Sequence, residues 1–477
     1  MNRTQRTTRR AFVAGATSGA AVALAACGIG GGSQTSQPAS SKLSGSFEFW
    51  QPWPIEQPTH GGPIGWKQLM DNYNLKGGPK MDILTPGGTG AFDTKVQAAF
   101  AGGSPPDGWQ VNELWTVVYA AKGFSAPLDD LIKRDKWDKT QIFPTAYEMM
   151  SWSGKVWAMM KHPGIIFNWL NVSLMEENGV PRSVPTTWTQ LDELMAKLTK
   201  KTGPDTYDFI GGIPNIWGQW QIVLPQANGA KFVSDDGRKA QLDSPEVVEA
   251  LEWAKGHIRR LGGLDALTAW RTTGVQPGDA QAPGTAANAN DIFAQKKMAV
   301  NINGNWNADS VRRWNKKMQT PLKFATAPIP SGPRGPKDPK ANVFSGGIQE
   351  AARKGGPKLD LMWDFMKYTA SKEGGYWTQL NTSDVSANRE GARDPRIIDN
   401  PDTGVGRKEF LPLYESGLGA YTIRHPVAAE IDAEYNRPLT PYLRDQAGSV
   451  RDELREANRL AQQKIDEFWQ QNPNAGK

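Results

Sequence analysis

Tryptophan is the residue type that stands out in this sequence, by its number and by its placement. The chain of 477 residues has 19 Trp, against 16 Phe and 10 Tyr. An indole ring is a large flat apolar surface with one hydrogen-bond donor, so it can pack in a core or stack on a flat ligand. Five Trp lie in or beside stretches rich in Gly, Pro or Asn: Trp50, Trp53, Trp217, Trp220 and Trp306. We expect these rings to form a stacking site, with core packing as the alternative for each of them.

The N-terminal residues indicate export. Arg9 and Arg10 form a twin-arginine signal, and the apolar run that follows is too short and too weakly apolar for a stable membrane span. It ends in Leu-Ala-Ala-Cys at Cys27, which is typical of a lipobox and uses the only cysteine of the chain. We therefore predict a signal peptide over residues 1–26, lipidation of Cys27, and anchoring to the outer face of a bacterial cytoplasmic membrane.

The positive charge of the whole sequence comes largely from this signal. It contains four arginines and no acidic residue, so its removal lowers the formal net charge from +6 to +2. A nucleic-acid partner requires a concentrated basic surface, and we expect none. Residues 27–44, rich in Gly, Ser, Gln and Thr, predict a flexible tether between the lipid and the folded part.

The rest of the chain predicts α/β architecture, because short strand patterns alternate with amphipathic helices. Strands are expected at residues 46–50, 80–84, 107–112, 299–303, 323–329 and 343–350. Helices are expected at residues 65–73, 92–101, 188–198, 245–261, 358–370 and 450–469. Thr187 is the expected N-cap of the third helix, with Gln190 at the capping-box position.

Several polar and aromatic residues lie where the first strands end. In open α/β sheets, ligands bind beyond the carboxyl ends of the strands. The residues at these ends are Trp50, Trp53, Gly87, Gly88, Asn112, Glu113 and Trp115. Asn112 and Glu113 are candidate ligand contacts because of this position. A strand-end turn explains the two residues equally well.

A series of short motifs, in a fixed order along the chain, resembles one protein family. The motifs are the lipobox, the Phe-Trp at residues 49–50, FAGGSPPD at 100–107, LDDL at 128–131, SGKVW at 153–157, Asn171 followed by ENGVP at 177–181, PTTW at 185–188, MAVNINGNW at 298–306, PIP at 328–330 and FSGG at 344–347. Together they resemble the extracellular solute-binding proteins of bacterial ABC importers, in the carbohydrate-binding branch that includes the maltose- and glycerol-phosphate-binding proteins. The chain departs from the family pattern at Trp157 to Met160 and around Leu170 to Val172.

This resemblance implies a two-lobed, periplasmic-binding-protein-like α/β fold with a ligand cleft between the lobes and several hinge crossovers. Lobe 1 is expected to comprise residues 45–161 and 331–396, and lobe 2 residues 162–330 and 397–472. Residues 161–164 and 326–330 are the expected hinge segments. The implied role is capture of a carbohydrate and its delivery to the permease subunits of an ABC importer, by a protein that acts as a monomer without a cofactor.

The resemblance also implies where the ligand is held. Trp50 and Trp53 would stack on it from lobe 1, and Trp217, Trp220 and Trp306 from lobe 2. Trp306 occupies the family's Gly-x-Trp position, which commonly faces the cleft. The residues expected to recognise hydroxyls are Asn112, Glu113, Asn305, Gly346 and Gly347, with Trp115 as a further aromatic contact.

The charge of the ligand remains open at this point. A neutral sugar needs few charged partners, whereas a phosphorylated or acidic sugar, or a glycerol phosphodiester, would need an arginine in the cleft. Arg424 is the residue that discriminates between these ligands, and a surface arginine is the alternative role for it. His425, which precedes a proline, is expected to be structural.

Hydrolysis is the competing class of function. A secreted glycoside hydrolase needs two carboxylates that flank one cleft, and Glu56, Asp107 and Glu113 are the nearest candidates. We find no Gly-x-Ser-x-Gly elbow, His-Glu-x-x-His motif, P-loop or dense cluster of metal-ligating residues in the sequence. We therefore expect no catalytic residues and no metal site.

Overall fold

The computed structural model describes residues 43–55, 61–213, 220–276, 287–415, 419–473 and 475. Residues 43–477 form one compact unit, separate from residues 1–42. The predicted signal peptide, Cys27 and most of the tether lie outside the described residues, as do Glu56 and Trp217. None of the helices within these ranges has the length and apolar character needed to cross a membrane.

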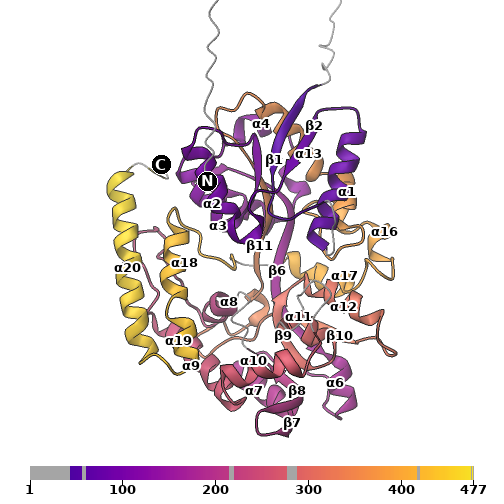
Figure 1. Cartoon of the computed structure of the whole chain (residues 1–477), viewed down its shortest axis with the longest axis vertical. Coiled ribbons are helices and arrows are strands. Elements are labelled where there is room, and N and C mark those ends of the chain that lie inside the picture. The colour runs from indigo at the N-terminus through magenta and orange to yellow at the C-terminus, as the bar shows by residue number, and fades with distance from the viewer. Residues whose placement is uncertain are drawn as a thin grey trace, which may run out of the picture. The chain divides into compact units, whose positions relative to one another are not determined.

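One mixed sheet organises the described part of the chain (Figure 1). Its strand order is β2-β1-β3-β11-β6-β9-β8-β7, and β10 pairs with β6 beside this path. The strands are β1 (Ser46–Trp50), β2 (Lys80–Leu84), β3 (Gly108–Asn112), β6 (Met159–Asn171), β7 (Lys200–Gly203), β8 (Thr206–Gly212), β9 (Met298–Gly304), β10 (Phe324–Ala327) and β11 (Phe344–Ala352). Strand β1 is parallel to β2 and β3, whereas β11 is antiparallel to both β3 and β6.

Strand β6 links the two halves of the sheet. Its first part pairs with β11, from Met159 opposite Glu350 to Ile166 opposite Phe344. Its last part pairs with β9 and β10, with Leu170 opposite both Val300 and Ala325. We call the half built on β2, β1, β3 and β11 lobe 1, and the half built on β9, β8, β7 and β10 lobe 2; Figure 1 shows β6 running from one to the other.

The helices lie in three stretches of the chain: before β6, between β6 and β11, and after β11. Those before β6 are α1 (Gly61–Leu75), α2 (Gly88–Ala101), α3 (Glu113–Ala121), α4 (Asp129–Arg134), η1 (Lys139–Gln141) and α5 (Pro144–Met149). Those between β6 and β11 are α6 (Val172–Glu177), α7 (Trp188–Lys197), α8 (Trp220–Ala227), α9 (Pro245–Arg260), α10 (Leu264–Thr273), α11 (Ala289–Ala294), α12 (Asn307–Asn315) and η2 (Pro339–Ala341). Those after β11 are α13 (Leu359–Thr369), α14 (Lys372–Gln379), α15 (Arg389–Ala392), α16 (Pro395–Ile398), α17 (Arg407–Phe410), η3 (Leu411–Glu415), α18 (Ala428–Asn436), α19 (Leu439–Leu443) and α20 (Val450–Gln471).

The sequence pattern explains why these segments adopt their structures. Phe47 and Phe49 alternate along β1, are fully buried, and pack against Phe365 of α13, which confirms the predicted first strand. The side chain of Thr187 accepts a hydrogen bond from the backbone N–H of Gln190, so the predicted N-cap of α7 is also confirmed. The capping box is displaced by one residue, because the amide oxygen of Gln190 accepts from the N–H of Thr186 at 2.8 Å.

The C-terminal helices contact both lobes. Helix α18 packs against α3 of lobe 1 and against α20, and α20 packs against α9 of lobe 2. A short hairpin of β4 (Ser151–Trp152) and β5 (Lys155–Val156) follows α5. Ser153 and Gly154 form its turn with φ of 53° and 72°, a left-handed conformation that glycine adopts at little cost.

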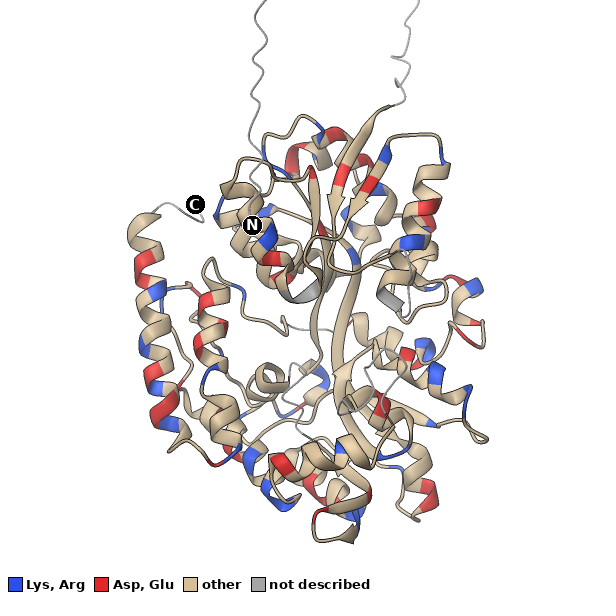
Figure 2. Ribbon diagram, viewed as in Figure 1, with Lys and Arg blue, Asp and Glu red and all other residues tan. Residues whose placement is uncertain are grey.

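Charged residues of both signs are interspersed over both lobes. Figure 2 shows Lys and Arg segments beside Asp and Glu segments on most surface helices, including α20. This mixed distribution agrees with the low formal charge expected for the chain after export. It gives no support to a nucleic-acid interface, which needs basic residues concentrated on one surface.

Candidate ligand site at the hinge

Three glycines form a flat floor where the strands cross between the lobes. Gly346 of β11 lies opposite Gly164 of β6, and Gly304 ends the neighbouring strand β9. A Cβ atom at Gly164 would lie 3.2 Å from the ring of Trp306 and 3.2 Å from the hydroxyl of Tyr421. A Cβ atom at Gly346 would overlap the Tyr421 ring and lie 2.7 Å from the Glu113 carboxyl carbon. Because these positions lack side chains, two aromatic rings can lie directly against the sheet.

Trp306 and Tyr421 form an aromatic pair on this floor. Their ring centroids are 6.2 Å apart, and the rings are inclined at 75° to each other. Trp306 is half-buried and follows β9, whereas Tyr421 is buried and belongs to the segment before α18. Edge-to-face rings of this kind hold each other in place, and the half-buried Trp306 ring keeps some exposed surface. Trp306 was predicted as a stacking residue, and Tyr421 was missed.

Glu113 is the buried carboxylate of this region. It is 1% exposed at the start of α3, and it accepts hydrogen bonds from the Gly347 N–H at 2.9 Å and the Thr422 hydroxyl at 3.1 Å. Burial raises the pKa of Glu113, and the opposing influences are these hydrogen bonds and the positive charge of Arg424. The side chain therefore joins helix α3 to strand β11 and to the C-terminal segment.

Gly347 has a backbone conformation that only glycine tolerates here. Its φ is +136°, and a Cβ atom would lie 2.7 Å from the Gly164 nitrogen and 2.8 Å from the Pro163 Cα. The backbone of β11 thus approaches β6 more closely than any other residue would allow. Its N–H points to Glu113, so the predicted residues Glu113, Gly346 and Gly347 are brought together.

Asn305 connects the end of β9 to both strand β6 and lobe 1. Its side-chain oxygen accepts from the Ile165 N–H at 3.1 Å, and its amide nitrogen donates to the Ser383 carbonyl at 3.3 Å. The residue is 1% exposed, so both ends of its amide are used internally. In this structure Asn305 fixes the position of Trp306, the next residue, and offers no free group at the surface.

Asn112 and Trp115 have local roles in lobe 1. The side chain of Asn112 caps α3 by accepting from the Trp115 N–H at 3.2 Å, which is the strand-end turn considered as its alternative role. The Trp115 ring stacks on Tyr119 with centroids 5.2 Å apart. Both residues remain half-buried.

Trp50 and Trp53 lie at the end of β1, as predicted. The indole N–H of Trp50 donates to Glu48 at 2.6 Å, and the backbone N–H of Trp53 donates to the side chain of Gln51 at 2.9 Å. Both rings are half-buried against the lobe 1 core. Each therefore keeps some exposed ring surface at the carboxyl end of the strand.

The structure does not give Trp220 the exposed ring face that the sequence suggested. Trp220 begins α8 and is 1% exposed, among Leu191, Leu224 and Val300 in the interior of lobe 2. The Pro/Gly-rich sequence before it resembles a loop, but helix formation at Trp220 turns its ring into the core. Trp217 lies outside the described residues.

Arg424 and His425 tie the C-terminal segment to both lobes. The Arg424 guanidinium donates to the Ser151 carbonyl of the β4–β5 hairpin and lies near the carboxylates of Glu113 and Glu148. Burial lowers its pKa. The His425 ring bonds the Gly237 carbonyl at 2.9 Å through Nε2, and its Nδ1 accepts from a backbone N–H. His425 is buried and structural, as expected.

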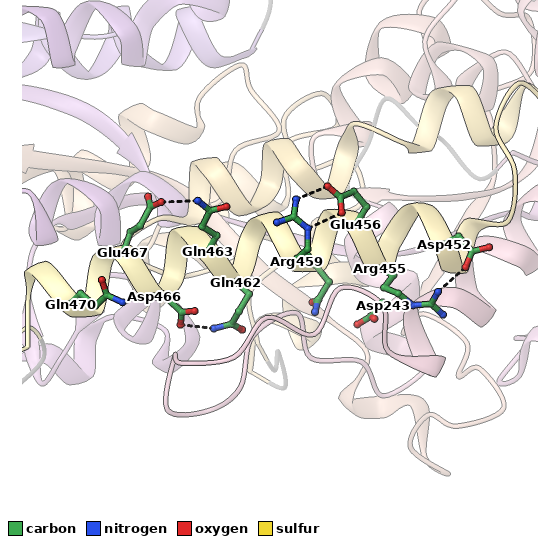
Figure 3. Close-up of a pocket in the computed structure, with 11 residues that line it drawn as sticks. Asp243, Asp452, Arg455, Glu456, Arg459, Gln462, Gln463, Asp466, Glu467 and Gln470 are labelled. Carbon is green, nitrogen blue, oxygen red and sulfur yellow. Dashed lines mark hydrogen bonds and ion pairs between the residues drawn. The ribbon is translucent and has the colours of Figure 1, made fainter.

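Two hollows in the surface differ in character. The first follows the outer face of α20, where Arg459 pairs with Glu456, Arg455 with Asp452, and Gln462 with Asp466 (Figure 3). Its polar groups largely satisfy one another along a single helix, which does not indicate a ligand site. The second, of about 480 Å³, lies between Trp152 of lobe 1 and the turn at residues 231–237 of lobe 2, and we call it the interlobe hollow.

Asp107 and Glu113, the two carboxylates considered for hydrolysis that lie in the described residues, are engaged by other groups. Asp107 accepts from the Glu48 N–H at 2.9 Å and pairs with Lys358 at 3.2 Å, and Glu113 is saturated as described above. Within the described ranges, no cluster of three or more His, Cys, Asp or Glu side chains could hold a metal ion.

Comparison with known proteins identifies the family. The sequence profile described as bacterial extracellular solute-binding protein matches residues 63–376, about two thirds of the chain, and the protein belongs to this family. The diacetylchitobiose binding protein DasA of Streptomyces coelicolor is 23% identical over 380 residues, which cover 77% of this chain and 80% of DasA.

Solved structures of the same architecture confirm the two-lobed fold. The mannotriose-bound protein CpMnBP1 has a TM-score of 0.71 and 22% identity, with 87% of this chain and 99% of that chain covered. The GacH receptor of Streptomyces glaucescens has a TM-score of 0.67 and 19% identity, with coverages of 89% and 98%. The sugar-binding protein MalE of Xanthomonas citri has a TM-score of 0.66 and 17% identity, with coverages of 90% and 98%.

Proposed function

We propose that this protein captures a carbohydrate at the hinge site and delivers it to an ABC importer. The observation that carries the proposal is the pair of Trp306 and Tyr421 on the floor formed by Gly164, Gly304 and Gly346. The C–H face of a sugar ring packs on aromatic rings, while its hydroxyls need donors and acceptors around them. Among similar proteins, DasA is named for diacetylchitobiose, and solved structures hold mannotriose, acarbose or maltose, which are all sugars or sugar mimics.

Delivery requires that the ligand change the conformation of the protein. The crossing segments near Gly164 and Gly347, with residues 326–330, are the proposed hinges between the two lobes. A ligand that contacts both lobes favours the closed form by its differential affinity for it. The permease subunits would recognise that closed form, with one protein molecule acting as a monomer.

The proposed location follows from the family and from the N-terminal sequence. A family of extracellular solute-binding proteins acts outside the cytoplasm, and the twin-arginine signal supplies the export route. Lipid attached to Cys27 would hold the protein at the outer face of the membrane, with residues 28–44 as the tether.

The surroundings of Arg424 favour a neutral ligand. Its guanidinium is hydrogen-bonded to the Ser151 carbonyl, and two nearby carboxylates, Glu113 and Glu148, offset its charge. A phosphate or carboxylate bound at Arg424 would lie close to these two carboxylates, which would repel it. We therefore favour a neutral sugar over an acidic one, and a binding role over hydrolysis, because Asp107 and Glu113 are both occupied by internal partners.

A thermal-shift screen of the chain from residue 28 onward tests this function. The panel comprises neutral mono- and oligosaccharides, acidic sugars and glycerol phosphodiesters. Ligand that binds only the folded state raises the melting temperature by mass action. We expect a shift with a neutral sugar that is lost in Trp306→Ala. A shift confined to phosphorylated or acidic compounds would overturn the neutral ligand, and shortening of the sugar chains would overturn the binding role.

A further inference from the structure

Helix α18 contacts both lobes, and one face of it is fully buried. Ala428, Ile431 and Tyr435 follow the i, i+3, i+7 spacing of one helix face, and each is 0% exposed. The helix packs against α3 of lobe 1 and against α20, beside which it lies in Figure 1. The contacts made by the two ends of this face determine with which lobe the helix moves.

The second half of α18 is fixed to lobe 2. The Tyr435 hydroxyl donates to the Gln221 carbonyl of α8 at 2.6 Å. The Tyr435 ring also packs edge-to-face on Phe232, with centroids 5.0 Å apart. Both partners belong to lobe 2, so a hydrogen bond and an aromatic contact hold this end of the helix there.

Helix α20 strengthens the attachment of α18 to lobe 2. The side-chain oxygen of Asn458 accepts from the Leu242 N–H at 2.8 Å. Gln462, one turn later, accepts from the Ala240 N–H at 2.8 Å. Helix α20 also packs against α9 of lobe 2 and against α18. We therefore expect α18 and α20 to move with lobe 2 as one body.

The first turn of α18 contacts lobe 1 through small apolar side chains. Ala428 is buried in one cluster with Leu114 and Val118 of α3, and the half-buried Ala429 packs against this cluster. No hydrogen bond or ion pair between described residues joins α18 to lobe 1. Because a methyl group buries little apolar surface, this contact is easier to separate than the contacts with lobe 2.

The chain enters α18 through a segment that is bonded to both lobes. The Thr422 hydroxyl donates to Glu113 of lobe 1 at 3.1 Å, and His425 bonds the Gly237 carbonyl of lobe 2 at 2.9 Å. This segment is therefore a crossing between the lobes, and α18 is the first helix beyond it. A rotation of lobe 2 about the crossing would move the first turn of α18 relative to α3.

Separation of α18 from α3 would expose apolar side chains of lobe 1. Leu114 is 9% exposed and Val118 is 1% exposed in the cluster that contains Ala428. Exposure of apolar surface to water is unfavourable, and this cost does not depend on a ligand. The contact thus favours the arrangement in which α18 and α3 touch, with or without a sugar.

We propose that the first turn of α18 is a latch that stabilises the closed form. The latch is the contact of Ala428 and Ala429 with α3, which forms when lobe 2 closes on lobe 1 and separates when lobe 2 opens. This inference rests on the proposed function, because closure serves to capture a ligand. The apparent affinity falls with the fraction of molecules in the binding-competent form. A weaker latch therefore lowers the affinity for sugar without a change in the groups that contact it.

Distances between spin labels test the movement, because the chain from residue 28 onward contains no cysteine. One pair joins Glu430→Cys on α18 to Lys122→Cys directly after α3, and the other joins Glu430→Cys to Glu252→Cys on α9; all three residues are exposed. Double electron–electron resonance is measured with and without manno-, malto- and N-acetylchito-oligosaccharides, whose binding is established by titration. Without sugar, we expect the first pair to show an additional longer distance, which a sugar that binds removes. The second pair should show one unchanged distance.

Two results of the distance measurement would overturn the latch. One is a single distance for the first pair that a binding sugar leaves unchanged. The other is a change confined to the second pair, which would assign α18 to lobe 1. A lack of binding by all three sugar series would overturn the proposed function alone, and the latch is then decided by a variant studied without sugar.

Ala428→Gln is that variant, because a longer side chain at a fully buried position forces α18 away from α3. We expect more of the longer distance in the first pair without sugar, and an affinity about tenfold lower for a sugar that binds. Ala433→Gln is the matched control, since Ala433 is an exposed alanine of the same helix, and it should change neither quantity. Distances and affinity equal to those of the wild type in Ala428→Gln would refute the latch. The labelled chain with Ala428 intact tests the movement even if Ala428→Gln fails to fold.

Discussion

The carboxylate of Glu113 accepts the N–H of Gly347 at 2.9 Å, at the point where strand β11 pairs with the crossing strand β6. Glu113 begins a lobe 1 helix, and Gly347 has φ of +136° beside strand β6. A residue predicted to recognise a ligand therefore also holds the backbone of β11. This relationship explains why Glu113 is buried although it carries no salt bridge to a neighbouring side chain in the described residues.

Replacing Glu113 by Leu should destabilise the protein. The substitution leaves the Gly347 N–H and the Thr422 hydroxyl without their acceptor, and an unpaired buried group costs about 1–3 kcal/mol. We expect a loss of about 2 kcal/mol or more in the free energy of unfolding, measured by urea denaturation. Glu113→Gln retains one acceptor oxygen and should lose less. Equal stability of Glu113→Leu and the wild type would contradict the role of this hydrogen bond.

Gly346→Ala should also destabilise the hinge. A Cβ atom there would overlap the Tyr421 ring and lie 2.7 Å from the Glu113 carboxyl carbon, so the ring or the strand must move. Overpacking of this kind costs about 1–3 kcal/mol, and displacement of Tyr421 should weaken sugar binding as well. Gly78→Ala is the control, because no atom lies within 4 Å of its added methyl group. The measurements are thermal unfolding and ligand titration of both variants; matching results would refute the steric argument.

The sequence predicted the framework of the fold well because local pattern determines it. The predicted strands at 46–50 and 80–84 have the observed bounds, since alternating residues such as Phe47 and Phe49 specify one buried face. Thr187 was identified as a cap because its hydroxyl acts within one turn of its own helix. These features depend on neighbours a few residues away.

The site was harder to predict because it depends on residues far apart in the chain. Gly164, Gly304 and Gly346 form one floor only when β6, β9 and β11 pair in the folded sheet. No periodic pattern in the sequence marks these three glycines. Tyr421 lay in the segment singled out for Arg424, but its approach to Trp306 is a tertiary contact. Trp220 was misjudged because the loop-like sequence before it gives no sign of the helix that buries its ring.

Cys27→Ser should release the protein from the membrane. The thiol is the only group of the predicted lipobox that can carry the lipid, and the described residues contain no helix able to span a membrane. In cell fractionation, the wild type should sediment with membranes and Cys27→Ser should be exported but soluble. The double variant Arg9→Lys, Arg10→Lys separates export from anchoring, because it should accumulate inside the cell. Membrane retention of Cys27→Ser would rule out the lipid anchor.

His162 should make the stability of the protein depend on pH between about 4 and 6.5. Burial lowers its pKa from 6.5 to about 4; the positive charges of Lys161 and Arg407 act in the same direction, and Asp384 opposes them. The unfolded chain therefore binds a proton near pH 6.5 that the folded protein does not accept until about pH 4, so stability is lost as the pH falls through this range. The loss attributable to His162 is up to about 3 kcal/mol, because each unit of pKa corresponds to about 1.4 kcal/mol. His162→Gln should flatten this part of the profile of melting temperature against pH, relative to the wild type. Parallel profiles for the two proteins would show that groups other than His162 control the loss of stability in acid.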